Sequence, residues 1–385
     1  MVRSRKEDKT AIYSYRNCDE LPEMWDEMLP ANHFLKKQNL RITELVQLPD
    51  VCFRYVLITE KDMPVAAAYF QLLNLKPHHI NKEKVKSWQY NVWKTYSSIL
   101  RPKMLVAGHL FRHDVASYYY NTNLSAFEAY QYYVMAIDFA LAETCAASVL
   151  VKDMTEELIT YFQHHASQYL LLRNDIAMQM ELPDEWQTMN DYEKALKHKY
   201  AQRYRKVRSA MPAVEIRELD ENQVEAAKEN IFKLYTNVTT QQQVRLGLLN
   251  SNFIPQLKKH YRDDFKVWGM YEGDIMVGFL SAWLKQEAFD MFYIGFSYEK
   301  NATLQLYFNI LFLSIEKSIQ YRKSRLILGR TALEAKARLG CKPRYLSTFL
   351  YIRNNYIRKR VLQIQEKNFV MEGSSWEERH PFKQS

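Results

Sequence analysis

The chain has 385 residues, of which 47% are apolar and 25% are charged, and its formal net charge at pH 7 is +9. A chain of this length is too long to form a single typical hydrophobic core and fits two domains of roughly 150–200 residues. The composition is that of a globular protein and excludes a mainly disordered or fibrous chain. The excess of basic residues favours an anionic partner, such as a nucleotide, an acyl-CoA, a tRNA or an acidic membrane surface.

The sequence also gives expectations about compartment and metal binding. The segment 1–10 is hydrophilic and lacks the apolar stretch of a secretory signal. No run of apolar residues is long enough to span a bilayer. The four cysteines, Cys18, Cys52, Cys145 and Cys341, lie far apart and without metal-ligand spacing. We therefore expect a cytoplasmic protein with reduced thiols and no metal site.

The first half of the chain alternates predicted helices and strands. Apolar spacing predicts a helix over 21–34, and β-branched and aromatic residues predict a hairpin over 51–72. The segment 74–103 is polar, rich in Lys and Trp and without a clear period, so it is interpreted as an insert. Two short strands, 105–111 and 116–120, are predicted next.

A long apolar helix follows in the first half. Ser125 and Glu128 have the spacing of a capping box, and the helix that they begin runs into a strand over 148–151. A helix over 155–165 and a strand over 176–182 complete a first α/β unit.

A basic helix is predicted over 189–211. Tyr192, Leu196, Tyr200 and Val207 fall near one face, which is expected to pack. The basic residues include Lys199, Arg203, Arg205 and Arg208. They form either a solvated helix face or a positive ridge that meets phosphate or a nucleic-acid backbone.

The second half repeats the pattern of the first. We predict strands over 214–219, 289–296, 326–328 and 345–352, a hairpin over 265–285, and helices through 235 and over 251–260, 301–322 and 332–339, with a loop over 236–243. The hairpins match at a constant offset of 212, which relates Glu60, Asp62 and Val65 to Glu272, Asp274 and Val277. The apolar helices that begin at Tyr130 and Tyr307 match at an offset of 177.

Two matching pairs in the same order indicate an internal duplication. The insert accounts for the change of offset between the two pairs. The expected fold class is α/β with mixed sheets, in two tandem domains. The predicted organisation is a domain over 1–188 with its insert at 74–103, a basic connecting helix over 189–212, a second domain over 213–352 and a polar C-terminal tail over 353–385.

The positions of the glycines and the segment that begins at Gly329 indicate a ligand site in the second domain. Gly108 is the only glycine before residue 247, and glycine lets a ligand approach the backbone. Gly329, Arg330 and Thr331 follow a predicted buried strand where a helix begins, with Lys336 one turn further on. Carboxyl ends of strands and helix N-termini bind anions, which predicts donor or anion recognition here. Alternatively, Thr331 is only an N-cap with Glu334 as its capping-box partner.

Several of these segments resemble one family. The stretches 292–299 and 329–340 resemble the C-terminal motifs of tandem GNAT-type acyltransferases, which are grouped with the Fem-type peptidoglycan aminoacyltransferases. The basic helix 192–208 resembles the segment that joins their domains, and 151–153 matches a strand end of their first domain. The resemblance runs from about residue 50 to 352. It implies two GNAT-like domains and transfer of an acyl or aminoacyl group to an amine of a cell-envelope or lipid precursor.

One departure from the GNAT pattern concerns the donor. The place of the glycine-rich pyrophosphate loop is taken by 297–303, which contains no glycine. Backbone amides of a helix start near 301–303, with Lys300 and Asn301 beside them, are left as the anion-binding candidates. The donor is therefore left open among an acyl-CoA, an acyl carrier protein and an aminoacyl-tRNA, with no tightly bound cofactor.

The reaction needs a base and oxyanion donors, for which the candidates are Asp290, Tyr293, Tyr298 and Glu299. The expected partners are the acyl donor and the amine acceptor, with tRNA and a peripheral contact with the inner membrane face as further candidates. A second hypothesis is a non-catalytic, degenerate GNAT-fold module that binds RNA or an anionic surface through the basic helix 192–208.

Overall fold

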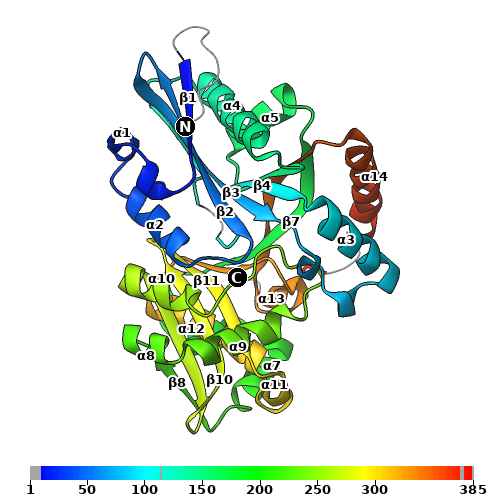
Figure 1. Ribbon diagram of the computed structural model, residues 1–385. Coiled ribbons are helices and arrows are strands. Elements are labelled where there is room, and N and C mark those ends of the chain that lie inside the picture. The colour runs from blue at the N-terminus through cyan, green and yellow to red at the C-terminus, as the bar shows by residue number, and fades with distance from the viewer. Residues whose placement is uncertain (1–9, 113–114, 373–376, 384–385) are drawn as a thin grey trace. The chain divides into compact units, whose positions relative to one another are not determined.

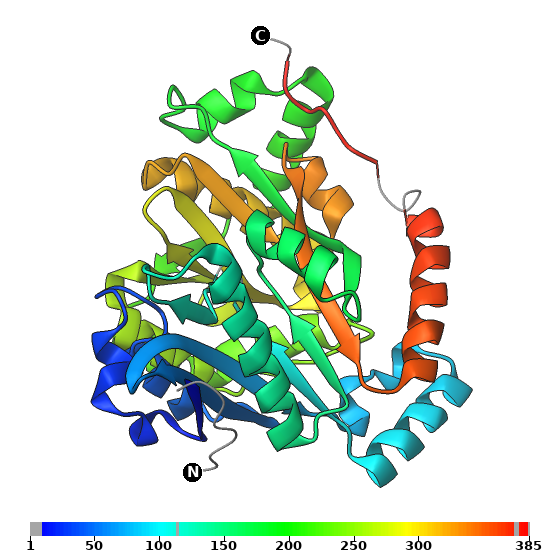
Figure 2. The ribbon, with the colours of Figure 1, turned by 90° about the horizontal axis from the view of Figure 1, so that it is seen from above.

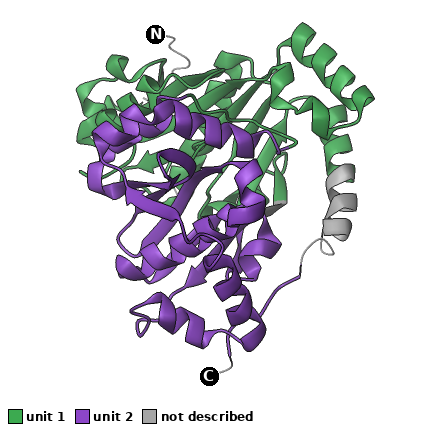
Figure 3. Cartoon of the chain, turned by 90° about the horizontal axis from the view of Figure 1, so that it is seen from below, with its two compact units in different colours: residues 1–173, 243–250, 346–368 green, residues 174–242, 251–345, 369–385 purple. Residues whose placement is uncertain are grey.

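The computed structural model describes residues 10–112, 115–372 and 377–383 (Figure 1). The chain forms two compact units, which Figure 3 shows in two colours. Unit 1 comprises 1–173, 243–250 and 346–368, and unit 2 comprises 174–242, 251–345 and 369–385. Within the described part of the chain, no helix combines the length and the apolar character that crossing a membrane requires.

Unit 1 is built on a mixed sheet. Its strands follow the order β1 (Thr10–Tyr15), β2 (Val51–Glu60), β3 (Met63–Asn74), β4 (Lys103–Ala107), β6 (Ser148–Val151) and β13 (Lys342–Ile352), and β5 (Tyr118–Tyr120) pairs with β3. β4 and β6 are parallel, and the other pairs are antiparallel. The predicted hairpin over 51–72 is thereby confirmed.

Helices cover both faces of this sheet. The helices of one face are α4 (Ala126–Thr144) and α5 (Glu156–His165), and those of the other are α1 (Glu23–Glu27) and α2 (Lys37–Leu45). Successive residues of β2 alternate between them, since Val56 packs in the α4 cluster and Tyr55 in the α1–α2 cluster. The predicted capping box is confirmed, because Ser125 Oγ accepts from Glu128 N and the Glu128 carboxylate accepts from Ser125 N.

Three expectations for unit 1 and the tail are corrected. The helix expected over 21–34 is limited to α1, and the next helix, α2, begins only after residue 34, with Pro30 between the two. The insert contains a regular helix, α3 (Ser87–Leu100), and the polar tail contains α14 (Asn355–Glu372). α3 escapes prediction because its large apolar side chains are exposed and do not follow a core-facing pattern.

Unit 2 has the same architecture. Its strands follow the order β7 (Leu170–Glu181), β12 (Arg325–Gly329), β11 (Ala288–Phe296), β10 (Ile275–Leu284), β9 (Phe265–Glu272) and β8 (Val214–Glu218). β11 and β12 are parallel. One face carries α6 (Met189–Ala195), α7 (His198–Arg208) and α12 (Leu306–Gln320), and the other carries α8 (Glu221–Ala226), α9 (Lys228–Thr239) and α10 (Phe253–Tyr261).

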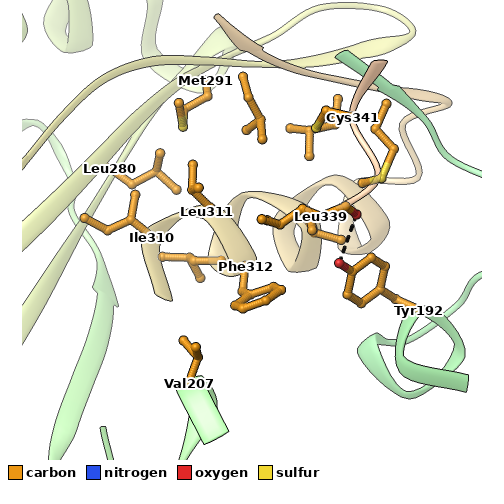
Figure 4. Packing of buried hydrophobic residues seen from close by; sticks show 14 of the residues in the cluster. Tyr192, Val207, Leu280, Met291, Ile310, Leu311, Phe312, Leu339 and Cys341 are labelled. Atoms are coloured by element: carbon orange, nitrogen blue, oxygen red, sulfur yellow. Dashed lines mark hydrogen bonds between the residues drawn. The ribbon is translucent and has the colours of Figure 1, made fainter. Parts of the chain in front are cut away.

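The face with α12 holds the main core of unit 2 (Figure 4). Leu311 and Phe312 of α12 pack among Met291, Leu339 and Cys341. The Tyr192 hydroxyl donates to the carbonyl oxygen of Leu339 at 3.0 Å. The continuous helix predicted over 189–211 is wrong, since Leu196 takes an extended conformation and ends α6 before α7 begins.

The strand order confirms the duplication. In each unit a long apolar helix, α4 or α12, connects two parallel strands, β4 and β6 or β11 and β12. The last strands are exchanged between the halves of the chain. β7 pairs with β12, although it follows the first half, and β13 pairs with β6. The compact units reflect this exchange, since unit 2 begins at 174 and unit 1 includes 346–368.

Candidate functional site

The parallel strands β11 and β12 separate after the third residue of β11. They pair over residues 288–290 and 325–327, and no further pairing of β11 with β12 occurs in the described chain. Beyond Asp290, β11 continues to Phe296 beside β10, while β12 ends at Gly329 beside β7. Ligands in open α/β sheets bind at the carboxyl ends of parallel strands. The separated ends of β11 and β12 are therefore the candidate site in unit 2.

A β-bulge lies on β11 at this separation. Phe292 and Tyr293 together oppose Ser281 of β10, where the register shifts by one residue. Ser281 Oγ accepts from Tyr293 N at 3.0 Å and donates to Tyr293 O at 2.8 Å, so the bulged backbone groups are satisfied. A bulge redirects side chains. Here it places both aromatic rings toward α9 and α10, while Met291 and Ile294 pack in the α12 core.

The Tyr293 ring lies among groups from three elements. It makes edge contacts with Tyr235 of α9 at 5.4 Å and with Phe253 of α10 at 6.2 Å between ring centroids. Burial raises the pKa of the Tyr293 phenol well above its usual value, the neighbouring Tyr235 raises it further, and the Arg330 guanidinium opposes these effects. Tyr293 is thus a neutral hydrogen-bond donor at physiological pH, close enough to Arg330 to interact with its charge.

Arg330 stands in a tight loop after β12. Gly329 has φ of +77° and Ala332 has φ of +53°, so the chain turns twice in the left-handed region around the half-buried Arg330. The interpretation of Thr331 as an N-cap is wrong, since Ala332 occupies that position of α13 (Leu333–Ala337) without a side-chain cap. Thr331 is exposed.

Glu334 does not complete a capping box either. Its carboxylate pairs with Arg338 and with Arg379, each at 2.8 Å. α13 spans five residues, which is too short for a strong N-terminal dipole. Any anion recognition at this loop therefore depends on the Arg330 side chain.

Lys336, which was expected to take part in anion recognition beside Arg330, lies in the core of unit 2. Its relative exposure is 2%. Burial lowers the pKa of its amine to about 8, against the opposing effect of the nearby Cys341. Among the described residues, no hydrogen bond or ion pair of its Nζ is found. An amine buried in this way disfavours its own protonation.

We expect Lys336→Met to stabilise the protein at pH 7 by roughly 2 kcal/mol, because methionine matches the lysine stem without a buried charge. The unfolded lysine binds its proton up to a higher pH than the folded one, so the penalty is full below pH 8 and is lost as pH rises toward the unfolded pKa. Urea unfolding of both proteins between pH 7 and pH 10 measures this convergence.

Lys258→Met provides the matched control. Lys258 is also buried, but its Nζ donates to the carbonyl oxygens of Arg262 at 3.0 Å and Phe265 at 3.2 Å. Its loss leaves two acceptors unsatisfied and should destabilise by roughly 1–3 kcal/mol. Destabilisation by both substitutions alike would contradict the expectation that burial of the Lys336 amine costs stability.

The candidates at 297–301 are held by local contacts. The helix expected from residue 301 begins earlier, as α11 (Tyr298–Leu304) with Ser297 as N-cap, so the Asn301 amide already donates to Ser297 O at 2.9 Å. Asn301 Oδ1 accepts from Tyr307 N at 2.9 Å and thereby caps α12. Lys300 pairs with Glu272 at 2.8 Å. The backbone amides of 301–303 therefore do not form an anion site.

The remaining catalytic candidates differ in burial. Asp290 is buried on β11 and pairs with Lys285 at 2.8 Å. Tyr298 is exposed with its ring beside Phe296, and Glu299 is exposed. The structure thus places Tyr293 on the part of β11 that has separated from β12 and Arg330 in the loop after β12, with Asp290 at the last paired position. Sequence reasoning missed Ser281, Tyr235 and Phe253, since only tertiary packing brings β10, α9 and α10 to Tyr293.

The corresponding position in unit 1 is filled. β4 and β6 pair over 104–107 and 148–151, and the backbone bond from Lys152 N to Ala107 O, at 2.9 Å, extends the contact. The buried Lys152 packs over Gly108 and donates from Nζ to His109 O at 2.6 Å. This side chain fills the place where β11 and β12 separate in unit 2, which favours unit 2 as the location of a site.

The arginines of the predicted ridge have intramolecular partners. Arg205 pairs with Glu193 at 2.9 Å, and Arg208 pairs with Glu316 of α12 at 3.1 Å. Arg203 stacks over the ring of Phe308 with its guanidinium carbon 4.6 Å from the centroid. Lys199 is exposed. These contacts attach α7 to α6 and α12, and they leave less unpaired positive charge for a nucleic-acid ridge than the sequence suggested.

A cluster with metal-ligand side chains lies elsewhere in unit 1. Asp50, His78 and His79 bring potential ligand atoms within 4.8 Å of one another. However, His79 Nδ1 accepts from Lys76 N at 2.9 Å, so its proton resides on Nε2, the atom that would face a metal. Burial lowers the His79 pKa to about 4, and the Lys76 ammonium pairs with Asp50. This cluster is a hydrogen-bonded ion pair.

The fold and the strand separation define a class: two tandem GNAT-type domains related by internal duplication. No family model matches the sequence, and no curated protein matches it at the sequence level. Among solved structures, FemX is similar over 91% of this chain and 99% of its own, at 9% identity and a TM-score of 0.50. This similarity establishes the shared fold and confirms the resemblance to the tandem GNAT-type and Fem-type architecture.

Two further structures are similar over most of the chain. A tandem GNAT protein from the clavulanic acid biosynthesis pathway, solved without AcCoA, matches 89% of this chain and 99% of its own at 7% identity and a TM-score of 0.47. L-PGS from Bacillus licheniformis matches 83% of this chain and 89% of its own at 7% identity and a TM-score of 0.45.

Proposed function

We propose that the chain is an N-acyltransferase that moves an acyl or aminoacyl group from a thioester or ester donor to an amine, with its site in unit 2. The observation that supports this most directly is the separation of β11 from β12, with Tyr293 and Arg330 at the separated ends. The strand edge of 291–296 offers backbone groups to an extended donor arm, as an added strand would use them. The donor classes remain acyl-CoA, acyl carrier protein and aminoacyl-tRNA.

In the proposed reaction the amine nitrogen attacks the donor carbonyl carbon, a C–N bond forms and the C–S or C–O bond breaks. The neutral Tyr293 phenol donates a hydrogen bond to the developing oxyanion or protonates the leaving group. Arg330 holds an anionic group of the donor through paired hydrogen bonds. The amine proton leaves to a carboxylate, for which Asp290 and Glu299 are the candidates, or to solvent.

A donor panel tests this function. The purified protein is incubated with acyl-CoA, acyl carrier protein or aminoacyl-tRNA and a set of primary amines, and amide formation is followed by mass spectrometry. Tyr293→Phe should lower the turnover of the active pair by roughly 10–100-fold, since it removes one oxyanion donor, while the melting temperature stays within about 2 °C.

Tyr298→Phe is the matched control, because its hydroxyl belongs to an exposed side chain on α11. Absence of amide product with every donor, or equal turnover in Tyr293→Phe and wild type, would contradict the proposed site. The non-catalytic alternative predicts instead a salt-dependent RNA affinity that is lost when Lys199, Arg203, Arg205 and Arg208 are reversed in charge. The arginine contacts on α7 make this alternative the less favoured one.

A further inference from the structure

We infer that unit 1 carries a docking surface for an anionic lipid bilayer, formed by α3 and the start of α14. We call it the α3–α14 surface and define it by the exposed apolar side chains of Trp88, Val92, Ile99, Leu100, Tyr356 and Ile357. The two helices meet at an open hollow of about 360 Å³, lined by Trp88, Gln89, Val92, Trp93, Tyr96 and Ile357. Figures 1 and 2 show α3 and α14 side by side.

α3 is an addition to the duplicated fold. Residues 75–102 connect β3 to β4 in unit 1, whereas residues 285–287 connect the corresponding strands β10 and β11 in unit 2. Unit 2 forms its sheet without such a helix, so closing the sheet of unit 1 does not require α3. Because the fold does not need α3, the large exposed apolar side chains of this helix indicate an interaction site.

The side chains of α3 divide into an anchored face and an exposed stripe. Trp93 Nε1 donates to the carbonyl oxygens of Lys76 at 3.2 Å and Pro77 at 3.3 Å, and Ser97 is buried one turn later. Trp88, Val92 and Ile99 recur at spacings of four and seven residues along another face. Trp88 is 64% exposed and Ile99 is 71% exposed. The anchored face fixes the helix so that its apolar stripe points outward.

The positive charge around this apolar stripe indicates what kind of partner binds the α3–α14 surface. Between residues 76 and 103 the basic residues are Lys76, Lys82, Lys84, Lys86, Lys94, Arg101 and Lys103, against a single acid, Glu83. From 353 to 362 they are Arg353, Arg358, Lys359 and Arg360, with no acid. The whole chain has 53 basic and 44 acidic residues, so the excess is concentrated here. Self-association through this surface would bring like charges together, which disfavours a second copy of the chain as the partner.

Exposed Trp and aliphatic side chains flanked by Lys and Arg fit the headgroup boundary of an anionic bilayer. The apolar side chains insert below the headgroups, and lysine stems extend along the apolar region while their ammonium groups meet lipid phosphates. The inference requires no acyl transfer, and its test therefore remains informative if the proposed function fails.

Vesicle flotation tests the inference with the full chain. We expect binding to phosphatidylcholine vesicles that contain a quarter of phosphatidylglycerol, weak binding to phosphatidylcholine alone, and loss of binding at high salt. Ile99→Ser should lower the partition constant about tenfold. Lys86→Glu combined with Lys94→Glu should lower it for anionic vesicles by a similar factor.

Ile275→Ser is the matched control, because Ile275 is 70% exposed on the β9–β10 hairpin of unit 2. It should bind vesicles as wild type does. Brominated lipid should quench the tryptophan fluorescence of wild type but quench Trp88→Phe much less. Unchanged melting temperatures show that each variant is folded.

Three outcomes would overturn the inference. The first is no binding to anionic vesicles at low salt, and the second is an equal loss of binding in Ile99→Ser and Ile275→Ser. The third is a dimer that Ile99→Ser dissociates while vesicle binding is unchanged, which would assign the surface to self-association.

Discussion

Gly295→Ala is expected to destabilise the protein by roughly 3 kcal/mol or more. A Cβ at residue 295 would lie 2.4 Å from the carbonyl carbon of Leu234 and 2.5 Å from the amide nitrogen of Tyr235. Both atoms belong to the backbone of α9, which cannot rotate aside as a side chain can. α9 must therefore move off β11, and thermal or urea unfolding measures the cost.

Gly278→Ala provides the control in the same sheet. A Cβ at residue 278 of β10 meets the flexible thioether of Met270 at 3.2 Å, and we expect a change within about 1 kcal/mol. The Gly295 variant should also lose activity per folded molecule, because moving α9 displaces Tyr235 from Tyr293. Equal stability of the two variants would show that β11 and α9 separate more easily than this packing indicates.

The sequence predicted the elements that local pattern specifies. The hairpins β2–β3 and β9–β10, the capping box at Ser125 and the repeated helix-to-strand order follow from side-chain alternation and turn chemistry. The helix over 189–211 was predicted as continuous because Tyr192, Leu196 and Val207 keep their helical spacing across the break. Those side chains are buried as expected, but Leu196 is extended.

Features that depend on tertiary contacts could not be predicted. The exchange of β7 and β13 leaves no local signal, because each strand has the same alternation whichever sheet receives it. The bulge at Phe292–Tyr293 depends on Ser281, an unremarkable residue in sequence whose hydroxyl satisfies both backbone groups. Lys336 was expected to bind an anion, because its burial depends on three-dimensional packing that the local sequence does not show.

Arg330→Lys should lower donor affinity or kcat/KM by roughly 10–100-fold, while the melting temperature stays close to that of wild type. Lysine keeps the positive charge but cannot form the paired, planar hydrogen bonds that guanidinium makes with phosphate or carboxylate. A loss of roughly 1.5–3 kcal/mol, typical of charged hydrogen bonds, corresponds to that range. The substitution therefore tests whether residue 330 needs the planar guanidinium group or only a positive charge. The charge at this residue also lowers the pKa of Tyr293.

Arg338→Lys is the matched control, because Arg338 is a nearby arginine on α13 whose guanidinium pairs with the Glu334 carboxylate at 2.8 Å. We expect a small change in melting temperature and unchanged kcat/KM for this variant. If Arg330 instead only held the loop between β12 and α13, Arg330→Lys would melt at lower temperature while donor affinity per folded molecule stayed the same. Measuring the melting temperature and the donor affinity on one preparation distinguishes the two roles. A role in the loop, which turns twice in the left-handed region at Gly329 and Ala332, changes the melting temperature, whereas a role in donor binding changes the affinity.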